Sequence, residues 1–473
     1  MRTSIFLLVG SLLALNATAL PTLAQSARGV VVHKPGAFPG YTLFAPLGNK
    51  STHLIDMDGK VVHSWLSEYM PANSVFLLEN GDLLRCSKAE GNRRFGSRGP
   101  SGGRIERYSW EGELLWNHVY SNDVQHHHHD IVPLPNGNVL LIAWHYVSKE
   151  DAIAAGRNPE TVSDDGIFPD KIVELKQTSA TDAETVWVWN TWDHLVQDFD
   201  ATKANFGDVA EHPELVDVNL NPRPRTDWMH SNCVSYNAQL DQVILNVRSF
   251  GEFFVIDHST TTAEAAGHSG GKYGRGGDIL YRWGNPANYK AGATGDRKLF
   301  GQHDARWVDS GFPGEGNITI FNNGSQRPGG EYSSVEEIVT PLTDKGVYEL
   351  QPNMPFGPKE PVWQYTASNK LDFYSSFISG AERLPNGNTL ICAGALGEFI
   401  EVTPDKEVVW KYLNPFFNEA APQASRAGRA ARNSPANSGR NRGGSPQSPH
   451  IVFRAERYSL DYSAFGRLKD SQR

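Results

Sequence analysis

Two patterns of apolar and polar residues alternate along the chain. The first is a pair of short segments in which apolar and polar residues alternate around a turn that contains Asp or Gly, and it ends at a tryptophan. Alternation with a period of two residues is typical of β-strands, and two such runs joined by a turn predict a β-hairpin. Six copies occur, which end at Trp65, Trp116, Trp189, Trp283, Trp363 and Trp410.

The second pattern follows each hairpin and consists of a polar residue, an apolar strand, a turn such as "LPNGN", and another apolar strand. Its clearest copies are "HDIVPLPNGNVLLIA" and "SGAERLPNGNTLICA". The sixth copy lacks its second strand, for which "GYTLFA" (40–45) is a candidate because it resembles "GNTLIC". The six copies begin at Asn73, His129, His230, His303, Ser379 and His450.

Six hairpins that alternate with six strand pairs predict an all-β fold, a six-bladed β-propeller whose last blade is closed by the N- and C-terminal strands. The propeller would span residues 30–473. A β-sandwich or two all-β domains are less favoured, because the alternation continues from about residue 40 to 460. Helix is expected only in short stretches such as 148–156.

Two segments fall outside this pattern. Residues 1–24 combine a basic start, an apolar run and small residues at Ala19 and Ala24, which is typical of a secretory signal. We therefore expect an exported protein, periplasmic or secreted, without a membrane span in its mature form, since no later segment approaches roughly 18 consecutive apolar residues. Residues 418–449 are rich in Ala, Gly, Ser, Pro and Arg and predict a disordered loop.

Charge and cysteine content narrow the function classes. The net charge is −9 and no basic stretch dominates, so a nucleic-acid partner is not suggested. An odd number of cysteines at wide spacing is not a disulfide framework, and their strand-like surroundings favour buried small apolar residues. One disulfide among them is possible, but its pairing is open. The cysteines are Cys86, Cys233 and Cys392.

The propeller brings the repeated positions together. Equivalent positions of radial repeats converge on the axis, so the six first residues of the strand pairs should form a circle at one mouth of the channel. A single buried histidine is usually a hydrogen-bonded core residue, but several that arrive from different blades are poorly explained that way. Positions further along the strand pairs add Lys88, Trp144, Arg248, Asn323 and Gly394.

Two chemistries suit such a cluster. Three neutral imidazoles can bind zinc or another transition metal. Alternatively, histidines with Arg and Asn can handle a tetrahedral anion, with one His as nucleophile and another as proton carrier. The cations Arg248 and Lys88 would repel a divalent metal and stabilise sulfate or phosphate, so anion chemistry is favoured and no metal is expected.

Four motifs occur in order along the chain, namely "HHDIVPLPNGN", "DWMHSN", "GQHDARW" and "LPNGNTLICAG". With "PGYTLFAP" (39–46) and "FRAERYSLDY" (453–462) at the ends, the sequence resembles the bacterial arylsulfate sulfotransferases of the exported, PAPS-independent propeller type. The resemblance implies a ping-pong transfer of a sulfuryl group from an aryl sulfate ester to a phenolic acceptor, through a sulfohistidine and without a cofactor.

The resemblance also implies roles for individual residues. His303 matches the nucleophile, and His230 with Asn232 matches an "HxN" motif. Arg248 matches the arginine that binds the sulfuryl oxygens, and His129 matches the family's other active-site histidine. The predicted substrate-binding residues are Asn232 and, by position, Lys88, Ser379 and Asn323.

Two other functions stay open at this stage. One is a metal-dependent propeller lyase or hydrolase that uses the circle of histidines, and the other is a non-catalytic propeller that binds a ligand at its mouth. The natural donor, the natural acceptor and the oligomeric state are also open.

Overall fold

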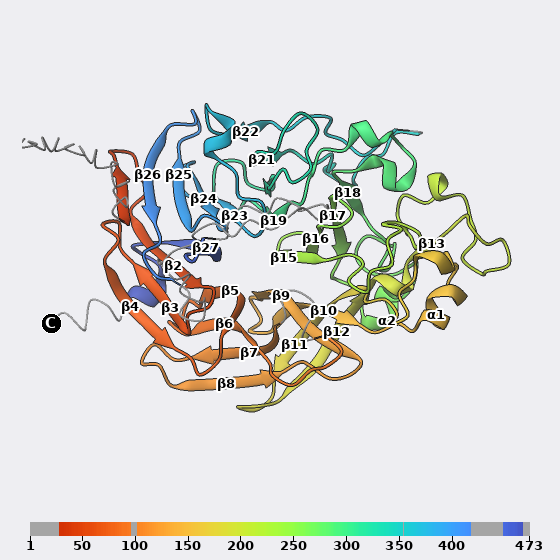
Figure 1. Ribbon diagram of the computed structural model, residues 1–473, viewed down its shortest axis with the longest axis horizontal. Coiled ribbons are helices and arrows are strands. Elements are labelled where there is room, and N and C mark those ends of the chain that lie inside the picture. The colour runs from red at the N-terminus through yellow and green to blue at the C-terminus, as the bar shows by residue number, and fades with distance from the viewer. Residues whose placement is uncertain (1–27, 96–101, 353, 418–447, 467–473) are drawn as a thin grey trace, which may run out of the picture.

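The computed structural model describes residues 28–95, 102–352, 354–417 and 448–466. The predicted signal at residues 1–24, and residues 418–447 of the predicted disordered loop, lie outside the described residues. Within the described part, six antiparallel sheets stand around a common centre, so the six-bladed propeller is confirmed (Figure 1).

Each blade is a meander of four strands that runs from the centre outwards. Blade 1 contains β27 (Val452–Ser459), β2 (Gly40–Pro46), β3 (Ser51–Ile55) and β4 (Val61–Leu66). Blade 2 contains β5 (Pro71–Leu77), β6 (Leu83–Lys88), β7 (Gly103–Tyr108) and β8 (Leu114–Val119). Blade 3 contains β9 (Gln125–Pro133), β10 (Val139–His145), β11 (Asp170–Gln177) and β12 (Ala183–Asn190).

The second half of the chain repeats this arrangement. Blade 4 contains β15 (Ser231–Asn237), β16 (Gln242–Val247), β17 (Glu252–Asp257) and β18 (Tyr281–Trp283). Blade 5 contains β19 (His303–Trp307), β20 (Ile318–Asn322), β21 (Ser334–Ile338) and β22 (Trp363–Tyr365). Blade 6 contains β23 (Gly380–Arg383), β24 (Thr389–Ala393), β25 (Glu398–Val402) and β26 (Val408–Leu413).

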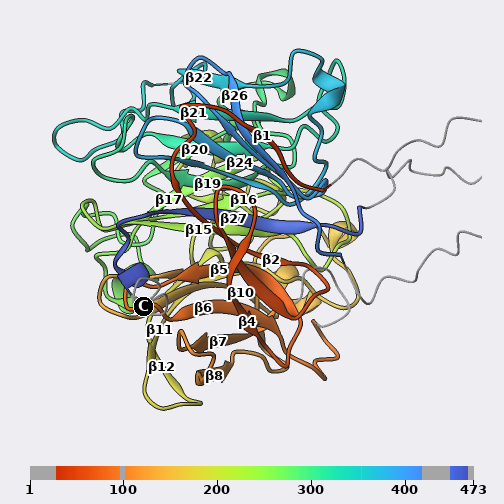
Figure 2. The same cartoon turned by 90° about the vertical axis from the view of Figure 1, so that its left-hand side faces the viewer.

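The two ends of the chain meet in blade 1, as the repeat predicts. Strand β27 pairs antiparallel with β2, and Tyr458 lies opposite Tyr41 (Figure 2). The predicted second strand "GYTLFA" is therefore β2. One strand was not predicted: β1 (Gly29–His33) pairs with β26 and gives blade 6 a fifth, outermost strand. It precedes the first repeat and belongs to neither pattern.

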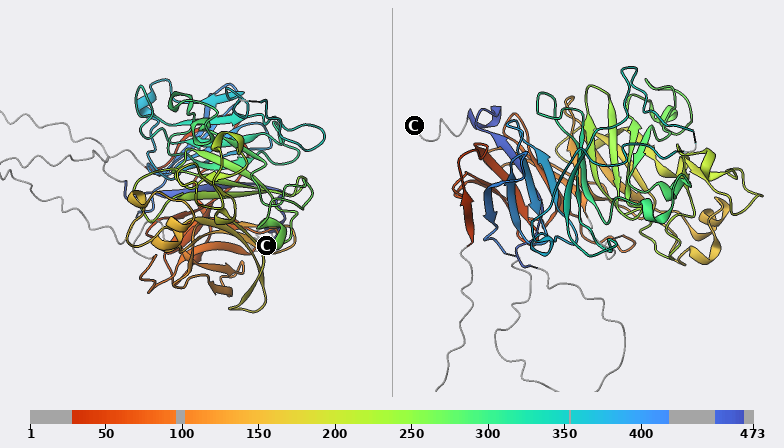
Figure 3. Two further views of the ribbon diagram at one scale, coloured as in Figure 1. Left: turned by 90° about the vertical axis from the view of Figure 1, so that its right-hand side faces the viewer. Right: turned by 90° about the horizontal axis from the view of Figure 1, so that it is seen from above.

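Helices are short and peripheral. Helix α1 (Lys149–Ala154) lies in the predicted stretch 148–156, with Ser148 as its N-cap, and α2 (Thr262–Ala265) begins with a capping box. A small parallel pair, β13 (Leu195–Val196) and β14 (Val216–Asp217), lies with α1 at one end of the molecule (Figures 1 and 3). No helix among the described residues is long and apolar enough to cross a membrane.

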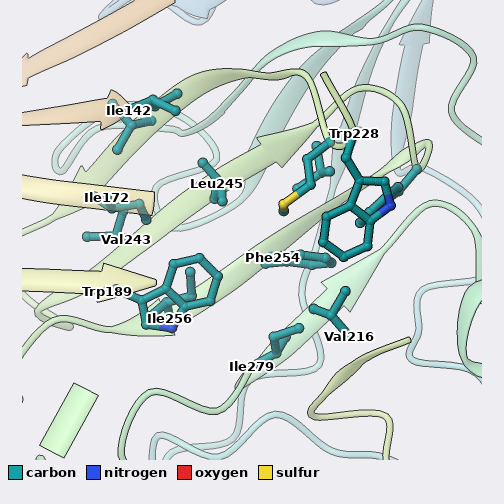
Figure 4. Packing of buried hydrophobic residues seen from close by; sticks show 14 of the residues in the cluster. Ile142, Ile172, Trp189, Val216, Trp228, Val243, Leu245, Phe254, Ile256 and Ile279 are labelled. Atoms are coloured by element: carbon teal, nitrogen blue, oxygen red, sulfur yellow. The ribbon is translucent and has the colours of Figure 1, made fainter. Parts of the chain in front are cut away.

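Apolar side chains between neighbouring blades form the core. Between blades 3 and 4, Ile142, Ile172 and Trp189 pack against Leu245 and Phe254 (Figure 4). Each of these side chains is fully buried. The alternating residues of both sheets thus interdigitate, as expected of sheets that pack face to face.

The six predicted tryptophans occupy the outermost regular strand of each blade and link it to the next. In five blades, the indole N–H donates to a carbonyl in the connection between the third and fourth strands of the following blade. Only Trp116 finds no hydrogen-bond partner among the described residues. The five bonds run from Trp65 to Ser109, Trp189 to Gly277, Trp283 to Pro358, Trp363 to Pro404 and Trp410 to Met57, at 2.7–3.0 Å.

A buried ion cluster ties the innermost strands together. Arg454 on β27 contacts Asp130 on β9 and Asp304 on β19, each at 3.1 Å. These carboxylates also accept backbone N–H groups from the adjacent blades, at Val234 and Ala381. The opposite charges hold the pKa of Arg454 above its usual range despite its burial.

The three cysteines are free and buried, which confirms the prediction of small core residues and leaves no disulfide among them. Cys86, Cys233 and Cys392 lie on β6, β15 and β24. Burial raises the pKa of each thiol, so the thiolate is disfavoured.

Candidate functional site

Three histidines converge where the inner strands begin. His129 on β9 lies edge-on to His230, which precedes β15, with ring centroids 4.8 Å apart. The aromatic ring of Phe453 lies 6.4 Å from both His129 and His303. Charge on His230 or His303 would lower the pKa of His129, so the three imidazoles are close enough to interact electrostatically. The circle of histidines predicted from the repeat is therefore assembled from blades 3, 4 and 5.

Left-handed backbone turns create this arrangement. His129 and His230 have φ values of 57° and 51°, a conformation that is uncommon for residues other than glycine. At His129 the turn coincides with an irregular register between β9 and β10. Strict alternation predicts that His128 points away from the axis and His127 towards it. The irregular register interrupts this alternation: His128 lies against His129, and His127 contacts Cys86.

The hydrogen bonds of His303 fix its tautomer. Its Nδ1 lies 3.0 Å from the carbonyl oxygen of Gly301 and 2.6 Å from Oδ1 of Asn323. The Asn323 amide nitrogen donates to the carbonyl oxygens of Ser375 and Ile378, so Oδ1 is the atom that faces His303. Since Nδ1 meets only acceptors, it carries the proton, and Nε2 keeps its lone pair.

His230 is oriented by a carboxylate that sequence reasoning missed. Its Nδ1 bonds to Oδ2 of Asp227, and Oδ1 of Asp227 accepts the indole N–H of Trp144 at 3.2 Å. Burial acts to raise the pKa of Asp227, but the neighbouring His230 outweighs it and holds this pKa below its usual value. An Asp that binds Nδ1 stabilises the imidazolium form and directs Nε2 outwards.

His129 is held by a similar chain of polar groups. Asp170 Oδ1 lies 3.1 Å from Nε2 of His128, and Nδ1 of His128 lies 2.7 Å from Nδ1 of His129. Because His128 donates from Nε2 to the carboxylate, its Nδ1 accepts and His129 Nδ1 donates. His128 is further fixed by stacking on Trp144, at 4.1 Å between centroids.

Arg248 provides the cation of the site. Within the described residues its guanidinium donates no hydrogen bond, although Asp227 attracts it electrostatically. Its Nη2 lies 3.7 Å from the position where a side chain at Gly301 would begin, beside His303. Burial lowers the pKa of Arg248, but the group stays charged at neutral pH. A partly buried guanidinium with free donors suits a bidentate anion.

Burial and the charge of Arg248 together keep His129 and His303 neutral. Burial first, and then Arg248, lowers the pKa of His303 well below 6.5. Burial and the neighbouring His230 lower the pKa of His129 in the same direction. Both imidazoles are therefore unprotonated at neutral pH.

The four predicted substrate-binding residues differ from one another in their contacts and exposure. Asn323 orients His303, and Asn232 bonds to Gln302 and Asn246. Ser379 bonds to Ser375 and to the backbone N–H of Gly394, so its hydroxyl is occupied. Lys88 is exposed at the end of β6 and makes no hydrogen bond or ion pair with the histidines among the described residues. Substrate binding by these four residues stays a prediction.

Two other positions of the predicted circle differ from expectation. His450 lies before β27 and bonds to the carbonyl oxygen of Phe416, and Phe453 lies near the central histidines in its place. The central position is thus three residues further along the chain than the repeat predicts, because the closing strand begins only at Val452. Asn73 of blade 2 is on a left-handed turn, and its buried Nδ2 has no partner among the described residues.

The spacing of the central histidines does not suit a single metal ion. Among the described residues, one group of His, Cys, Asp or Glu has ligand atoms that all lie within 4.8 Å of one another, and it is His194, His268 and Asp278 at the periphery. The ligand atoms of the central histidines lie further apart, and the charge of nearby Arg248 disfavours a bound cation.

Comparisons with known proteins identify the family. The model of the arylsulfotransferase (ASST) family matches residues 43–415. Solved structures are similar only distantly. A protein of unknown function from Bacteroides caccae has a TM-score of 0.43 and 12% identity over 79% of this chain and 93% of that one. Virginiamycin B lyase from Staphylococcus aureus has a TM-score of 0.37 and 8% identity over 83% and 86%.

No curated protein is similar in sequence at a significant level. The family match, in contrast, spans most of the chain, including all three histidines and Arg248. The chain belongs to the arylsulfotransferase family and is an aryl sulfotransferase.

Proposed function

We propose that the protein transfers a sulfuryl group from an aryl sulfate ester to a phenolic acceptor in two steps, through a sulfohistidine at His303. The observation that supports this most is the hydrogen bonding of His303, whose Nδ1 meets two acceptors. A neutral imidazole with a free Nε2 lone pair can attack an anionic sulfate ester without charge repulsion.

In the first step, Nε2 of His303 attacks sulfur, the N–S bond forms and the S–O bond to the aryl group breaks. The guanidinium of Arg248 offsets charge on the sulfuryl oxygens. The leaving phenoxide takes a proton from Nε2 of His230, whose imidazolium form Asp227 stabilises.

In the second step, neutral His230 accepts the proton of the phenolic acceptor while its oxygen attacks sulfur. The N–S bond breaks, and His303 returns to its neutral form. The ring of His129 lies edge-on to that of His230, so its Nε2 can hold the acceptor hydroxyl by a hydrogen bond. No nucleotide is consumed, which agrees with the export that residues 1–24 predict.

The intermediate is the direct test. We expect 4-nitrophenyl sulfate to give a burst of one nitrophenolate per chain, and mass spectrometry to find one added SO₃ on the peptide that contains His303. His303→Ala should show neither, whereas His118→Ala, which changes a histidine at the blade edge, should behave as wild type. Full turnover by His303→Ala, or SO₃ on His129 or His230 instead, would overturn the proposal.

A second measurement addresses metal dependence. Because the mechanism uses imidazoles and a guanidinium, we expect prolonged dialysis against a chelator to leave the burst unchanged. Loss of the burst that added zinc restores would favour a metal-dependent reaction at the histidines.

A further inference from the structure

A second polar cluster lies far from the central histidines, at the boundary between blades 3 and 4. His194 follows β12, whereas His268 and Asp278 lie in the connection between β17 and β18. Oδ1 of Asp278 lies 3.1 Å from Nδ1 of His194 and 2.7 Å from Nδ1 of His268. The proposed sulfuryl transfer uses none of these residues.

The partners of His194 leave one of its nitrogens without a suitable hydrogen bond. Nε2 faces the carbonyl oxygen of Ala265 at 2.8 Å, and Nδ1 faces the carboxylate of Asp278. Both partners accept, but a neutral imidazole has only one N–H to donate. If Nε2 donates to Ala265, the Nδ1 lone pair is directed at a carboxylate, where a cation resolves the conflict. A metal-bound histidine characteristically donates its other nitrogen to such a carbonyl.

The surroundings hold these groups in place. The ring of His194 is fully buried and stacks on Trp189 at 5.7 Å between centroids. The loop that carries His268 is tied back by the bond from Gly277 N to Gly267 O. A side chain at Gly277 would lie 2.6 Å from Nε2 of His194, so this position requires glycine.

The cluster is also accessible. The side chain of His268 is 63% exposed and lines a cavity of about 510 Å³. Bonds from zinc to nitrogen or oxygen are about 2.0–2.2 Å long, so tetrahedral ligands lie about 3.3 Å apart. The observed separations of 2.7 and 3.1 Å need to open by only a few tenths of an ångström.

We propose that His194, His268 and Asp278 bind one divalent transition-metal ion, with Zn²⁺ as the fitting species, and that the ion links blades 3 and 4. Two imidazoles and one carboxylate are donors that Zn²⁺ prefers, and His268, which lines the cavity, leaves the site accessible to the ion. The ion would stabilise the fold and take no part in sulfuryl transfer.

The test uses the full chain without a polyhistidine tag, dialysed first against a chelator. We expect titration with Zn²⁺ to give one tight site per chain and a rise in the melting temperature. His268→Ala and Asp278→Asn should each weaken binding at least about tenfold, since even the outer partners of metal-bound histidines contribute about 10- to 100-fold.

Controls separate this site from the central histidines. His118→Ala should bind Zn²⁺ as wild type does, and His268→Ala should keep the nitrophenolate burst. Equal binding by wild type and His268→Ala would overturn the proposal. So would the absence of binding by wild type at 100 μM Zn²⁺, a concentration about 100 times a micromolar dissociation constant. A lost burst in His303→Ala bears only on the proposed function.

Discussion

The partner of each Nδ1 atom decides which nitrogen of a central histidine is held by the protein and which is left without a partner among the described residues. Asn323 and Gly301 accept from His303, Asp227 binds His230, and His128 accepts from His129. In all three cases Nε2 is left for chemistry. The residues that do this are as important to the site as the histidines themselves.

Asp227 provides a test at the residue scale. We expect Asp227→Asn to lower kcat by roughly 10²- to 10⁴-fold with little change in KM, because the amide can fix the wrong tautomer of His230 and cannot stabilise its imidazolium. Steady-state kinetics with 4-nitrophenyl sulfate measures this. Asp164→Asn, at a fully exposed carboxylate, should have no effect, and an equally large loss there would contradict the role given to Asp227.

Sequence reasoning found the histidines but not the residues that orient them. His129, His230 and His303 stand at repeated positions, so the fold itself predicts their convergence. Asp227 lies in a connection outside the repeat, and Asp170 begins β11 just before the predicted hairpin, so no periodicity marks either residue. Asn323 lies beside the central histidines, as its repeated position suggests. A sequence pattern cannot distinguish a residue that binds substrate from one that binds His303.

At the scale of elements, the outermost strands connect one blade to the next through their tryptophans. Both ends of each hydrogen bond recur in the repeat, because the donor is on the fourth strand and the acceptor on the turn before the next fourth strand. The recurring Trp that marked the hairpins in the sequence is therefore explained by contacts between blades.

Trp65 and Trp116 form a matched pair for testing these bonds. Both are buried, but only Trp65 has a partner, the carbonyl oxygen of Ser109. We expect Trp65→Phe to lower the free energy of unfolding by about 1 kcal/mol more than Trp116→Phe, since the latter removes an N–H without a partner. Urea denaturation checks this, and equal losses would show that the indole bond contributes nothing.

For the elements, the hairpins, the strand pairs and the closure of blade 1 followed from the sequence. Strand β1 and the pair β13–β14 did not, because each is a single addition without a repeated counterpart. The repeat does not predict which residue of the closing strand reaches the centre, for a related reason. Strand β27 follows a segment outside the repeat, so no repeated pattern aligns His450 or Phe453 with the other central residues.

At the scale of the whole molecule, the centre is held by charge as well as by apolar packing. Arg454 joins blade 1 to Asp130 of blade 3 and Asp304 of blade 5. Removing one member of a buried ion cluster leaves the opposite charges without compensation.

We therefore expect Arg454→Met to destabilise the fold by about 3–5 kcal/mol. The comparison is Arg223→Met, at an exposed arginine, which should change the free energy of unfolding by less than about 0.5 kcal/mol. Chemical denaturation of both variants provides the measurement. A loss below about 1 kcal/mol for Arg454→Met would mean that the two carboxylates are compensated in another way.

The protein should lose stability as the pH falls below about 6.5. Burial lowers the pKa of His53, His126 and His145 to about 4, and those of His129 and His303 well below 6.5. In the unfolded chain all five titrate near 6.5, so below that pH the unfolded state binds more protons. Their stabilising contribution is complete above about pH 6.5 and declines as the pH falls towards 4.

Each of these histidines contributes up to about 1.4 kcal/mol per pH unit to the decline. Denaturation with urea at pH 8, 6 and 5 should show it, and His145→Gln should reduce the slope. A free energy of unfolding that is the same at pH 7 and pH 5 would contradict the shifts.

The closing strand also completes the centre of the molecule last in the order of synthesis. All three central histidines and Arg248 are synthesised before residue 304, but Phe453 and Arg454 come some 150 residues later on β27. Until that strand pairs with β2, blade 1 lacks its innermost strand, and Asp130 and Asp304 lack the guanidinium that compensates their charges. We therefore expect a nascent chain to stay inactive until the circle of blades closes.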